Sequence, residues 1–352
     1  MREKIKLPDS IFFGDIKRQF KTWLDQQAYS SYFMLVDSSS SVYCLPEIRH
    51  VHPKIKWNII EIPMGEQYKT ITTCSLIWEE LLKNGADRHS LLVNLGGGVV
   101  GDMGGFAAGT YMRGIDFVQI PTTLLAMVDA SVGGKVAVDF RLAKNIIGLF
   151  KNPVANFIDS RWLATLSDTN KRSGWGEMIK HTIIADEEAF REIQQITSPF
   201  DINWDKWIQH SISIKYNIVQ SDPTEKGLRK GLNFGHTVGH AVETFFLELG
   251  QPKSHGECVA IGMICAAFIS NKVAGLPPAQ LKDIVAVIMK WFDKTTIPEN
   301  QLDKILSFMM RDKKNYSGLP NFTLIPQIGS YIYDQNPDWA LIRESILFYN
   351  QQ

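Results

Sequence analysis

The chain has 352 residues, which is long enough for two domains that each bury a core. Lysine plus arginine and aspartate plus glutamate both number 37, and the resulting zero net charge disfavours nucleic acid or an anionic membrane as a partner. The longest apolar run, residues 258–270, is too short to cross a bilayer, and the N-terminal MREKIKLPDS lacks the apolar core of a signal peptide. The cysteines form no CxxC pair. We therefore expect a cytoplasmic protein without a disulfide framework.

Strand-like and helix-like segments alternate in the first half of the chain. Apolar runs predict buried strands at residues 32–36, 59–62, 91–95 and 117–120, and residues 71–84 predict a helix that ends at Gly85. This alternation predicts a mostly parallel sheet with helices on both faces.

The second half of the chain has a different pattern. Helical periodicity covers residues 205–220, 237–249, 256–274 and 278–292, and strand signals almost vanish after Asp159. We therefore predict an α/β domain at residues 1–165 and a mainly α-helical domain at residues 166–352.

A glycine-rich segment follows the predicted strand at residues 91–95. Gly96, Gly98 and Gly101 form a GxGxxG match, whose bare backbone N–H groups at a helix N-terminus suit a pyrophosphate. A tight structural turn explains these glycines equally well. The acidic residue expected about 20 positions later in a Rossmann site is not obvious, since Asp116 comes early.

Charged and polar residues interrupt the mostly apolar segment at residues 113–150. They are Arg113, Asp129, Lys135, Lys144 and Asn145. A buried charge needs a partner or a ligand, so these residues predict a substrate pocket, although Asp129 and Lys135 would also suit a structural ion pair. Thr122 and Thr123 suit either cofactor hydroxyls or the cap of the next helix.

Histidines with metal-ligand spacing occur in the helical half. His236 and His240 lie four residues apart on one predicted helix face, and His255 follows 15 residues later. Zinc takes such nitrogen ligands together with a carboxylate, for which Glu177 is a candidate. The spacing leaves open which two histidines bind metal and whether His181 competes with Glu177; an isolated histidine in a helix is more often structural.

Five motifs occur in order between about Asp37 and Gly329: GGGVVGD, PTTLLAMVDASVGGK, KNIIGLF, LNFGHTVGHAVE and HGECVAIGM. Together they resemble the 3-dehydroquinate synthase family of sugar-phosphate cyclases. The resemblance implies a Rossmann-like NAD-binding α/β domain, a mainly α-helical metal-binding domain and a homodimer. It also implies a phosphorus-oxygen lyase of the shikimate pathway of aromatic amino-acid biosynthesis.

The reaction implied by this resemblance converts 3-deoxy-D-arabino-heptulosonate 7-phosphate to 3-dehydroquinate and phosphate. Its steps are transient oxidation by NAD, β-elimination of phosphate, reduction, and intramolecular aldol closure. Relatives that cyclise other sugar phosphates, of the inosose or valiolone type, have similar motifs. Further alternatives are a metal-dependent alcohol dehydrogenase of the glycerol dehydrogenase kind and an inactive NAD-binding module.

The resemblance also assigns residues by their positions in the motifs. Zinc, or Co²⁺ in its place, would be bound by Glu177, His236 and His255, which leaves His240 as a polar active-site residue. The residues around NAD would be Asp37, Glu66, Lys69, Gly97, Gly98, Val99, Asp102, Thr122, Thr123, Asp129, Lys135, Lys144, Trp162 and Thr165. The residues around the substrate would be Arg113, Asp129, Lys135, Lys144, Asn145, Lys180, Lys215, Arg229, Asn233, His240 and one of Lys313 or Lys314. So many cations suit a ligand that carries both a carboxylate and a phosphate.

Overall fold

The structure is a computed structural model that describes residues 7–141, 143–199, 202–310 and 320–352. The chain forms two compact units. The first comprises the chain up to Ser167 together with Trp204–Ser213, and the second comprises Asp168–Asn203 and Ile214–Gln352.

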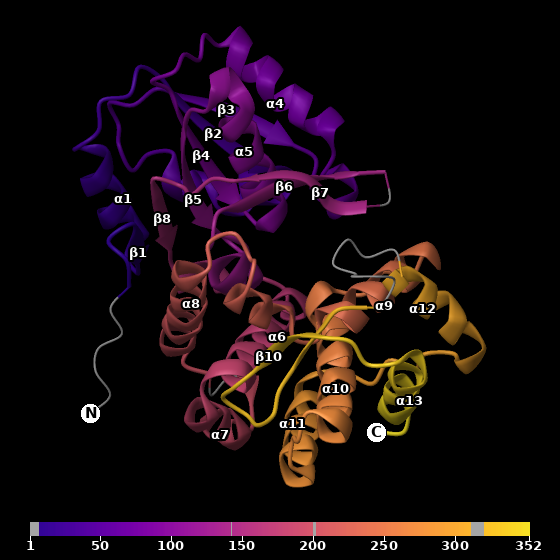
Figure 1. Ribbon diagram of the computed structural model, residues 1–352. Helices are drawn as coiled ribbons and strands as arrows, with labels where there is room; N and C mark the ends of the chain where they lie inside the picture. Colours follow the sequence, from indigo (N-terminus) through magenta and orange to yellow (C-terminus); the bar gives the residue numbers. More distant parts are fainter. Residues whose placement is uncertain (1–6, 142, 200–201, 311–319) are drawn as a thin grey trace. The chain divides into compact units, whose positions relative to one another are not determined.

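The first unit contains a six-stranded sheet of order β1-β8-β5-β4-β2-β3, in which all pairings are parallel (Figure 1). The strands are β1 (Ile11–Phe13), β2 (Tyr32–Asp37), β3 (Trp57–Ile62), β4 (Leu91–Gly96), β5 (Asp116–Pro121) and β8 (Ala155–Ile158). The prediction of a parallel sheet and of its four longer strands is confirmed. The strands β1 and β8, with three and four residues, were too short to stand out in the sequence.

Helices connect these strands. They are α1 (Ile16–Leu24), α2 (Ser38–Tyr43), α3 (Leu45–Ile48), α4 (Ile71–Lys83) and α5 (Gly98–Thr110), with the short helices η1 (Glu66–Tyr68), η2 (Tyr111–Arg113), η3 (Ala126–Ala130) and η4 (Ser160–Ala164). The helix predicted at residues 71–84 is confirmed as α4.

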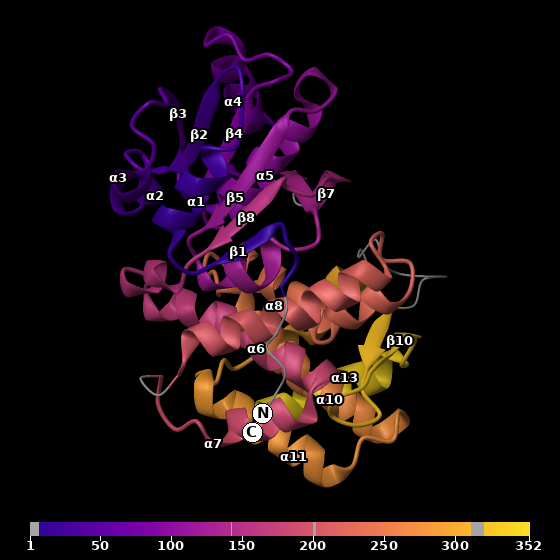
Figure 2. The ribbon, with the colours of Figure 1, turned by 90° about the vertical axis from the view of Figure 1, so that its left-hand side faces the viewer.

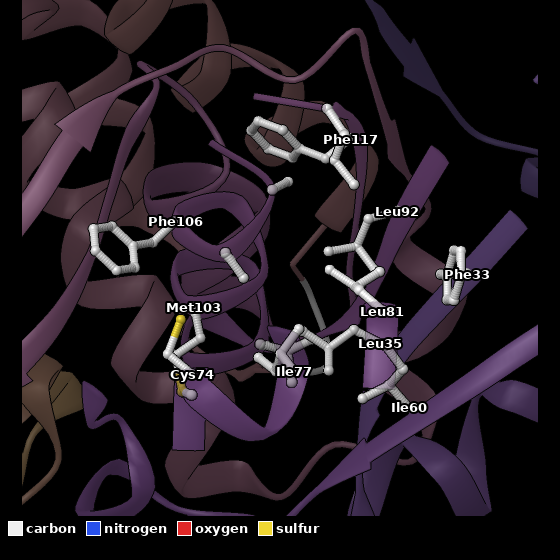
Figure 3. Close-up of a cluster of buried hydrophobic side chains, with 14 of the residues drawn as sticks. Phe33, Leu35, Ile60, Cys74, Ile77, Leu81, Leu92, Met103, Phe106 and Phe117 are labelled. Atoms are coloured by element: carbon white, nitrogen blue, oxygen red, sulfur yellow. The ribbon is translucent and has the colours of Figure 1, made fainter. Parts of the chain in front are cut away.

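The two faces of the sheet are covered by different helices. Strand residues such as Phe33, Leu92 and Phe117 pack with Ile77 of α4 and Met103 of α5 in one buried apolar cluster (Figure 3). On the opposite face, Phe157 of β8 contacts Phe20 of α1, with ring centroids 5.1 Å apart. Helices on both faces explain why the central strands β4 and β5 are buried along almost their whole length.

An antiparallel hairpin, β6 (Lys135–Phe140) and β7 (Ala143–Phe150), also belongs to the first unit. The expectation that the charged and polar residues of this segment are buried is wrong for Arg113, Lys135 and Asn145, which are exposed. Lys135 is the first residue of β6, before the buried residues 136–138, and Arg113 is the last residue of η2, so both lie at the ends of their elements.

The second unit is mainly α-helical, as predicted. Its helices are α6 (Asp168–Ala185), α7 (Glu187–Gln195), η6 (Leu228–Asn233), α9 (His236–Glu248), α10 (His255–Val273), α11 (Pro278–Trp291), η7 (Glu299–Gln301), α12 (Leu302–Met310) and α13 (Trp339–Asn350). Helix α8 (Trp204–Ser221) is divided between the two units. A two-stranded antiparallel ribbon joins β9 (Phe322–Leu324) and β10 (Ile332–Gln335), and β10 is yellow in Figure 2.

Helix α10 forms the core of the second unit and contacts α6, α9, α11 and α13 (Figure 1). By length and composition this helix could cross a membrane, but 78% of its apolar window is buried inside the structure. Burial against four neighbouring helices accounts for its apolar composition.

Asp159, directly after β8, anchors the start of α1. Its buried carboxylate accepts hydrogen bonds from the backbone N–H groups of Ile16 (3.0 Å) and Arg161 (2.9 Å) and pairs with the Arg161 guanidinium at 2.7 Å. Burial by itself would raise the pKa of this carboxyl, but the Arg161 and backbone hydrogen bonds outweigh it and lower the pKa below the usual value.

We expect Asp159→Ala to lower the free energy of unfolding by about 1–3 kcal/mol at pH 7, because a buried N–H loses its acceptor. A lowered folded-state pKa stabilises the protein above the unfolded-state pKa, and this contribution is lost as the pH falls through the folded value. The difference between wild type and variant should therefore shrink below about pH 4. Urea unfolding across this pH range measures the difference in the free energy of unfolding between wild type and variant. A difference that does not change with pH would contradict the assignment of Asp159 as an ionised acceptor.

Candidate active site

Glu177 is the centre of the candidate metal site in the second unit. It lies on α6, is 0% exposed, and its Oε2 accepts a hydrogen bond from Lys180, which is 1% exposed. The other oxygen, Oε1, has no hydrogen-bond partner among the described residues. It lies 3.6 Å from Nε2 of His236 and 3.6 Å from Nε2 of His255. A buried carboxylate oxygen that faces two imidazole nitrogens in this way suits a divalent metal.

The imidazoles of His236, His240 and His255 gather beside this carboxylate. Their nearest nitrogens lie within 4.8 Å of one another, and their ring centroids are 5.2 to 5.8 Å apart. Nδ1 of His236 is 3.2 Å from the Phe234 carbonyl oxygen, which leaves Nε2 directed at Glu177. Of the three histidine pairs that the spacing left open, this geometry favours His236 and His255.

The electrostatics of the cluster are strongly coupled. Burial lowers the pKa of His236 well below its usual value, and nearby Lys180 lowers it further. Burial would also lower the pKa of His255, but the carboxylates of Glu177 and Glu243 outweigh it and raise the pKa to about 10. Burial would raise the pKa of Glu177, but Lys180 and His236 hold it well below the usual range. Glu177 is therefore an ionised carboxylate.

Local sequence explains how the cluster forms. His236 and His240 are one turn apart on α9, so they share a face. Ser254 and Glu257 form a capping box at the N-terminus of α10: each side chain accepts a hydrogen bond from the backbone N–H of the other residue. His255, which follows Ser254, is therefore the first residue of the helix. The two helices approach closely because Gly262 has no side chain.

Other predicted substrate residues of the second unit are buried or half-buried. Lys215 on α8 and Arg229 on η6 are both buried, and the Arg229 guanidinium donates to the Pro223 carbonyl oxygen at 2.7 Å. The Asn233 side chain donates to Oε1 of Glu225 at 2.7 Å. Glu225 was not predicted, since it lies in the polar turn segment SDPTEKG, where an acid carries no distinctive signal. The candidates Lys313 and Lys314 lie outside the described residues.

In the first unit, β4 leads directly into α5 through the glycine-rich turn. Gly97 is the N-cap of α5 and supplies no side-chain cap, so the first backbone N–H groups of the helix remain available to an anion. A Cβ atom on Gly97 would lie 3.0 Å from Cγ2 of Thr123. Thr123 itself accepts a hydrogen bond from the Ala126 N–H at 3.2 Å, as a helix cap does, and Thr122 beside it is buried.

Lys69 links several of the predicted nucleotide and substrate residues. This buried ammonium donates to Oδ2 of Asp102 at 2.6 Å and to Oδ1 of Asn145 at 2.5 Å. Lys144, next in the chain to Asn145, lies 3.7 Å from Glu66. Burial would lower the pKa of Lys69, but Asp102 and Glu66 outweigh it and raise the pKa, so the group is cationic. The structure therefore brings five of the predicted residues together at one edge of the first unit.

The remaining predicted residues of the first unit have other environments. Asp37 caps α2 by accepting from the backbone N–H groups of Ser39 and Ser40, at 3.0 and 2.7 Å. Arg113 has a φ of 68°, in the left-handed region. The others are Gly98 and Val99 in the first turn of α5, Asp129 in η3, Lys135 at the start of β6, buried Trp162 in η4 and exposed Thr165 just after it.

Comparison with known proteins agrees with the motif evidence. Residues 59–173 match the family described as 3-dehydroquinate synthase N-terminal, and residues 174–315 match the family described as 3-dehydroquinate synthase C-terminal. The chain is 37% identical over 343 residues to the 3-dehydroquinate synthase of Parabacteroides distasonis, with 96% of each chain covered.

Two solved structures have a similar fold. A 2-deoxy-scyllo-inosose synthase complexed with carbaglucose-6-phosphate, NAD⁺ and Co²⁺ is 26% identical, with a TM-score of 0.85 and coverage of 96% of this chain and 95% of that one. The 2-epi-5-epi-valiolone synthase ValA of Streptomyces hygroscopicus, with NAD⁺ and Zn²⁺ bound, is 21% identical, with a TM-score of 0.85 and coverage of 100% and 99%. With its two halves matched to the two domain families, the chain belongs to the 3-dehydroquinate synthase family.

Proposed function

We propose that the chain converts 3-deoxy-D-arabino-heptulosonate 7-phosphate to 3-dehydroquinate and phosphate at a metal site formed by Glu177, His236 and His255. Membership of the 3-dehydroquinate synthase family supports the reaction. The main observation that supports the metal site concerns the Oε1 atom of Glu177. This atom is buried without a hydrogen-bond partner among the described residues, and it lies 3.6 Å from two imidazole nitrogens.

The donor set fits zinc, with Co²⁺ as a substitute, because it combines two nitrogens and one carboxylate oxygen and leaves a position for substrate. A bound metal would lower the pKa of the substrate hydroxyl, and bound NAD would accept and later return the hydride. Lys180 keeps the Glu177 carboxylate ionised and oriented. We assign proton transfer at the hydroxyl to His240 and Asn233.

We assign NAD to the first unit, at the N-terminus of α5. The backbone N–H groups from Gly97 to Val99 would hold the pyrophosphate, and the Lys69–Asp102 pair would border the site. The related 2-deoxy-scyllo-inosose synthase structure contains NAD⁺, which supports NAD as the cofactor.

Cations are assigned to the anionic substrate. Within the second unit we assign the buried cations Lys180, Lys215 and Arg229 to this role. The sugar phosphate that the family uses carries both a carboxylate and a phosphate, which accounts for local cations in a chain of zero net charge. We also propose that the protein is a homodimer, as the resemblance implies, and that it is cytoplasmic, as expected from the sequence.

The decisive experiment is a phosphate-release assay with the purified protein and the heptulosonate phosphate. We expect release that is lost after treatment with a chelator and restored by Zn²⁺ or Co²⁺, without lasting absorbance from NADH, because the cofactor is regenerated in each turnover. Release from glucose 6-phosphate instead would indicate a cyclase of another specificity. Net NADH formation from a simple alcohol would indicate a dehydrogenase.

A further inference from the structure

Glu243 contacts the candidate metal ligand His255 on the side away from Glu177. It lies on α9, one turn beyond His240, and its side chain is 12% exposed. Oε2 of Glu243 is 3.4 Å from Nδ1 of His255, whereas Nε2 of His255 is 3.6 Å from Glu177. The imidazole of His255 therefore has a carboxylate at each of its two nitrogens.

Histidine chemistry gives this arrangement a function. A neutral imidazole that offers the lone pair of Nε2 to a metal carries its proton on Nδ1, which then requires an acceptor. For His236 the acceptor is the backbone carbonyl oxygen of Phe234, at 3.2 Å. For His255 the group in that place is the Glu243 carboxylate.

The backbone alone does not set the ring of His255. The capping box of Ser254 and Glu257 determines where the main chain enters α10, but rotation about the side-chain bonds of His255 remains. An acceptor on the neighbouring helix α9 restricts that rotation.

We propose that Glu243 is a positioning residue, which accepts the Nδ1–H of His255 and directs Nε2 at Glu177, so that the ring is already oriented when zinc replaces the Nε2 proton and the affinity of the site for zinc is raised. The inference rests on the proposed metal site. The competing interpretation is that Glu243 only stabilises the packing of α9 against α10. Zinc affinity, measured together with the stability of the metal-free protein, distinguishes the positioning role from this structural role.

The experiment compares wild type with Glu243→Ala and Glu243→Gln. Zinc affinity is measured by competition with a chromophoric chelator, the ligand geometry from the visible spectrum of bound Co²⁺, and stability from thermal unfolding of the metal-free proteins. We expect Glu243→Ala to weaken zinc binding by about 10 to 100-fold and to change the Co²⁺ spectrum, with an unchanged unfolding midpoint without metal. Glu243→Gln keeps an amide oxygen as acceptor and should recover part of the affinity.

Glu248 supplies the matched control on the same helix. It pairs with Lys304 at 3.0 Å near the surface, so Glu248→Gln should leave zinc affinity unchanged. Wild-type affinity in Glu243→Ala would overturn the positioning role while leaving the metal site intact. Glu243→Ala could instead bind zinc more weakly because the metal-free protein is less stable. A loss of stability large enough to account for the weaker binding would support the structural role and overturn the positioning role. Absence of zinc binding by wild type would overturn the proposed metal site itself.

Discussion

Replacing His255 with alanine is expected to abolish zinc binding and to lower turnover by about a thousandfold. A metal that polarises a substrate oxygen contributes several kcal/mol to catalysis, and each 1.36 kcal/mol corresponds to a factor of ten. The substitution removes one of the two Nε2 atoms that lie 3.6 Å from Glu177, and it leaves the buried Glu177–Lys180 ion pair in place. Metal content and phosphate release are the two measurements.

Two other histidines test the specificity of this result. His240→Ala should keep zinc and lose turnover, because we assign His240 to proton transfer rather than to the metal. His89 is exposed in the first unit, so His89→Ala should change neither measurement. Full zinc content in His255→Ala would refute the ligand assignment, and loss of zinc in His240→Ala would place His240 among the ligands.

Replacing Gly262 with alanine is expected to lower the free energy of unfolding of the second unit by about 3 kcal/mol or more. A Cβ atom at this position of α10 would lie 1.8 Å from the carbonyl oxygen of Gly235 and 2.8 Å from the backbone nitrogen of Gly239. Both are backbone atoms, so no rotation of a side chain can relieve the clash, and α9 must move away from α10. Urea unfolding measures the loss.

The same substitution should also weaken metal binding, because Gly235 directly precedes His236 and any displacement separates His236 from His255. Lys272→Ala, at the exposed end of α10, is the control and should change the free energy of unfolding by less than about 1 kcal/mol. Wild-type stability in Gly262→Ala would mean that the two helices are less closely packed than the structure indicates.

Residues near one another in the chain carried most of the fold prediction. The strands β2, β3, β4 and β5 were predicted because short runs of four or five mostly apolar residues suffice to mark a buried strand. The helices α4, α9, α10 and α11 were predicted to within one or two residues at each end, because their apolar periodicity extends over three turns or more. The hairpin β6–β7 was missed, since the charged and polar residues of this segment were interpreted as the lining of a substrate pocket.

The candidate site was likewise predicted in part from residues that are close in the chain and in part only from the structure. Spacing of four residues places His236 and His240 on one helix face, and the ordered motifs identify the family and the types of residue that a metal and an anion require. The resemblance also implied Glu177, His236 and His255 as ligands. The distances of 3.6 Å between Glu177 and these two imidazoles, the contact of Glu243 with His255 and the exposure of Arg113 and Lys135 were decided by tertiary structure alone. These features depend on how the helices α6, α9 and α10 pack and on which residues lie at the ends of their elements, and such long-range packing has no counterpart in local spacing along the chain.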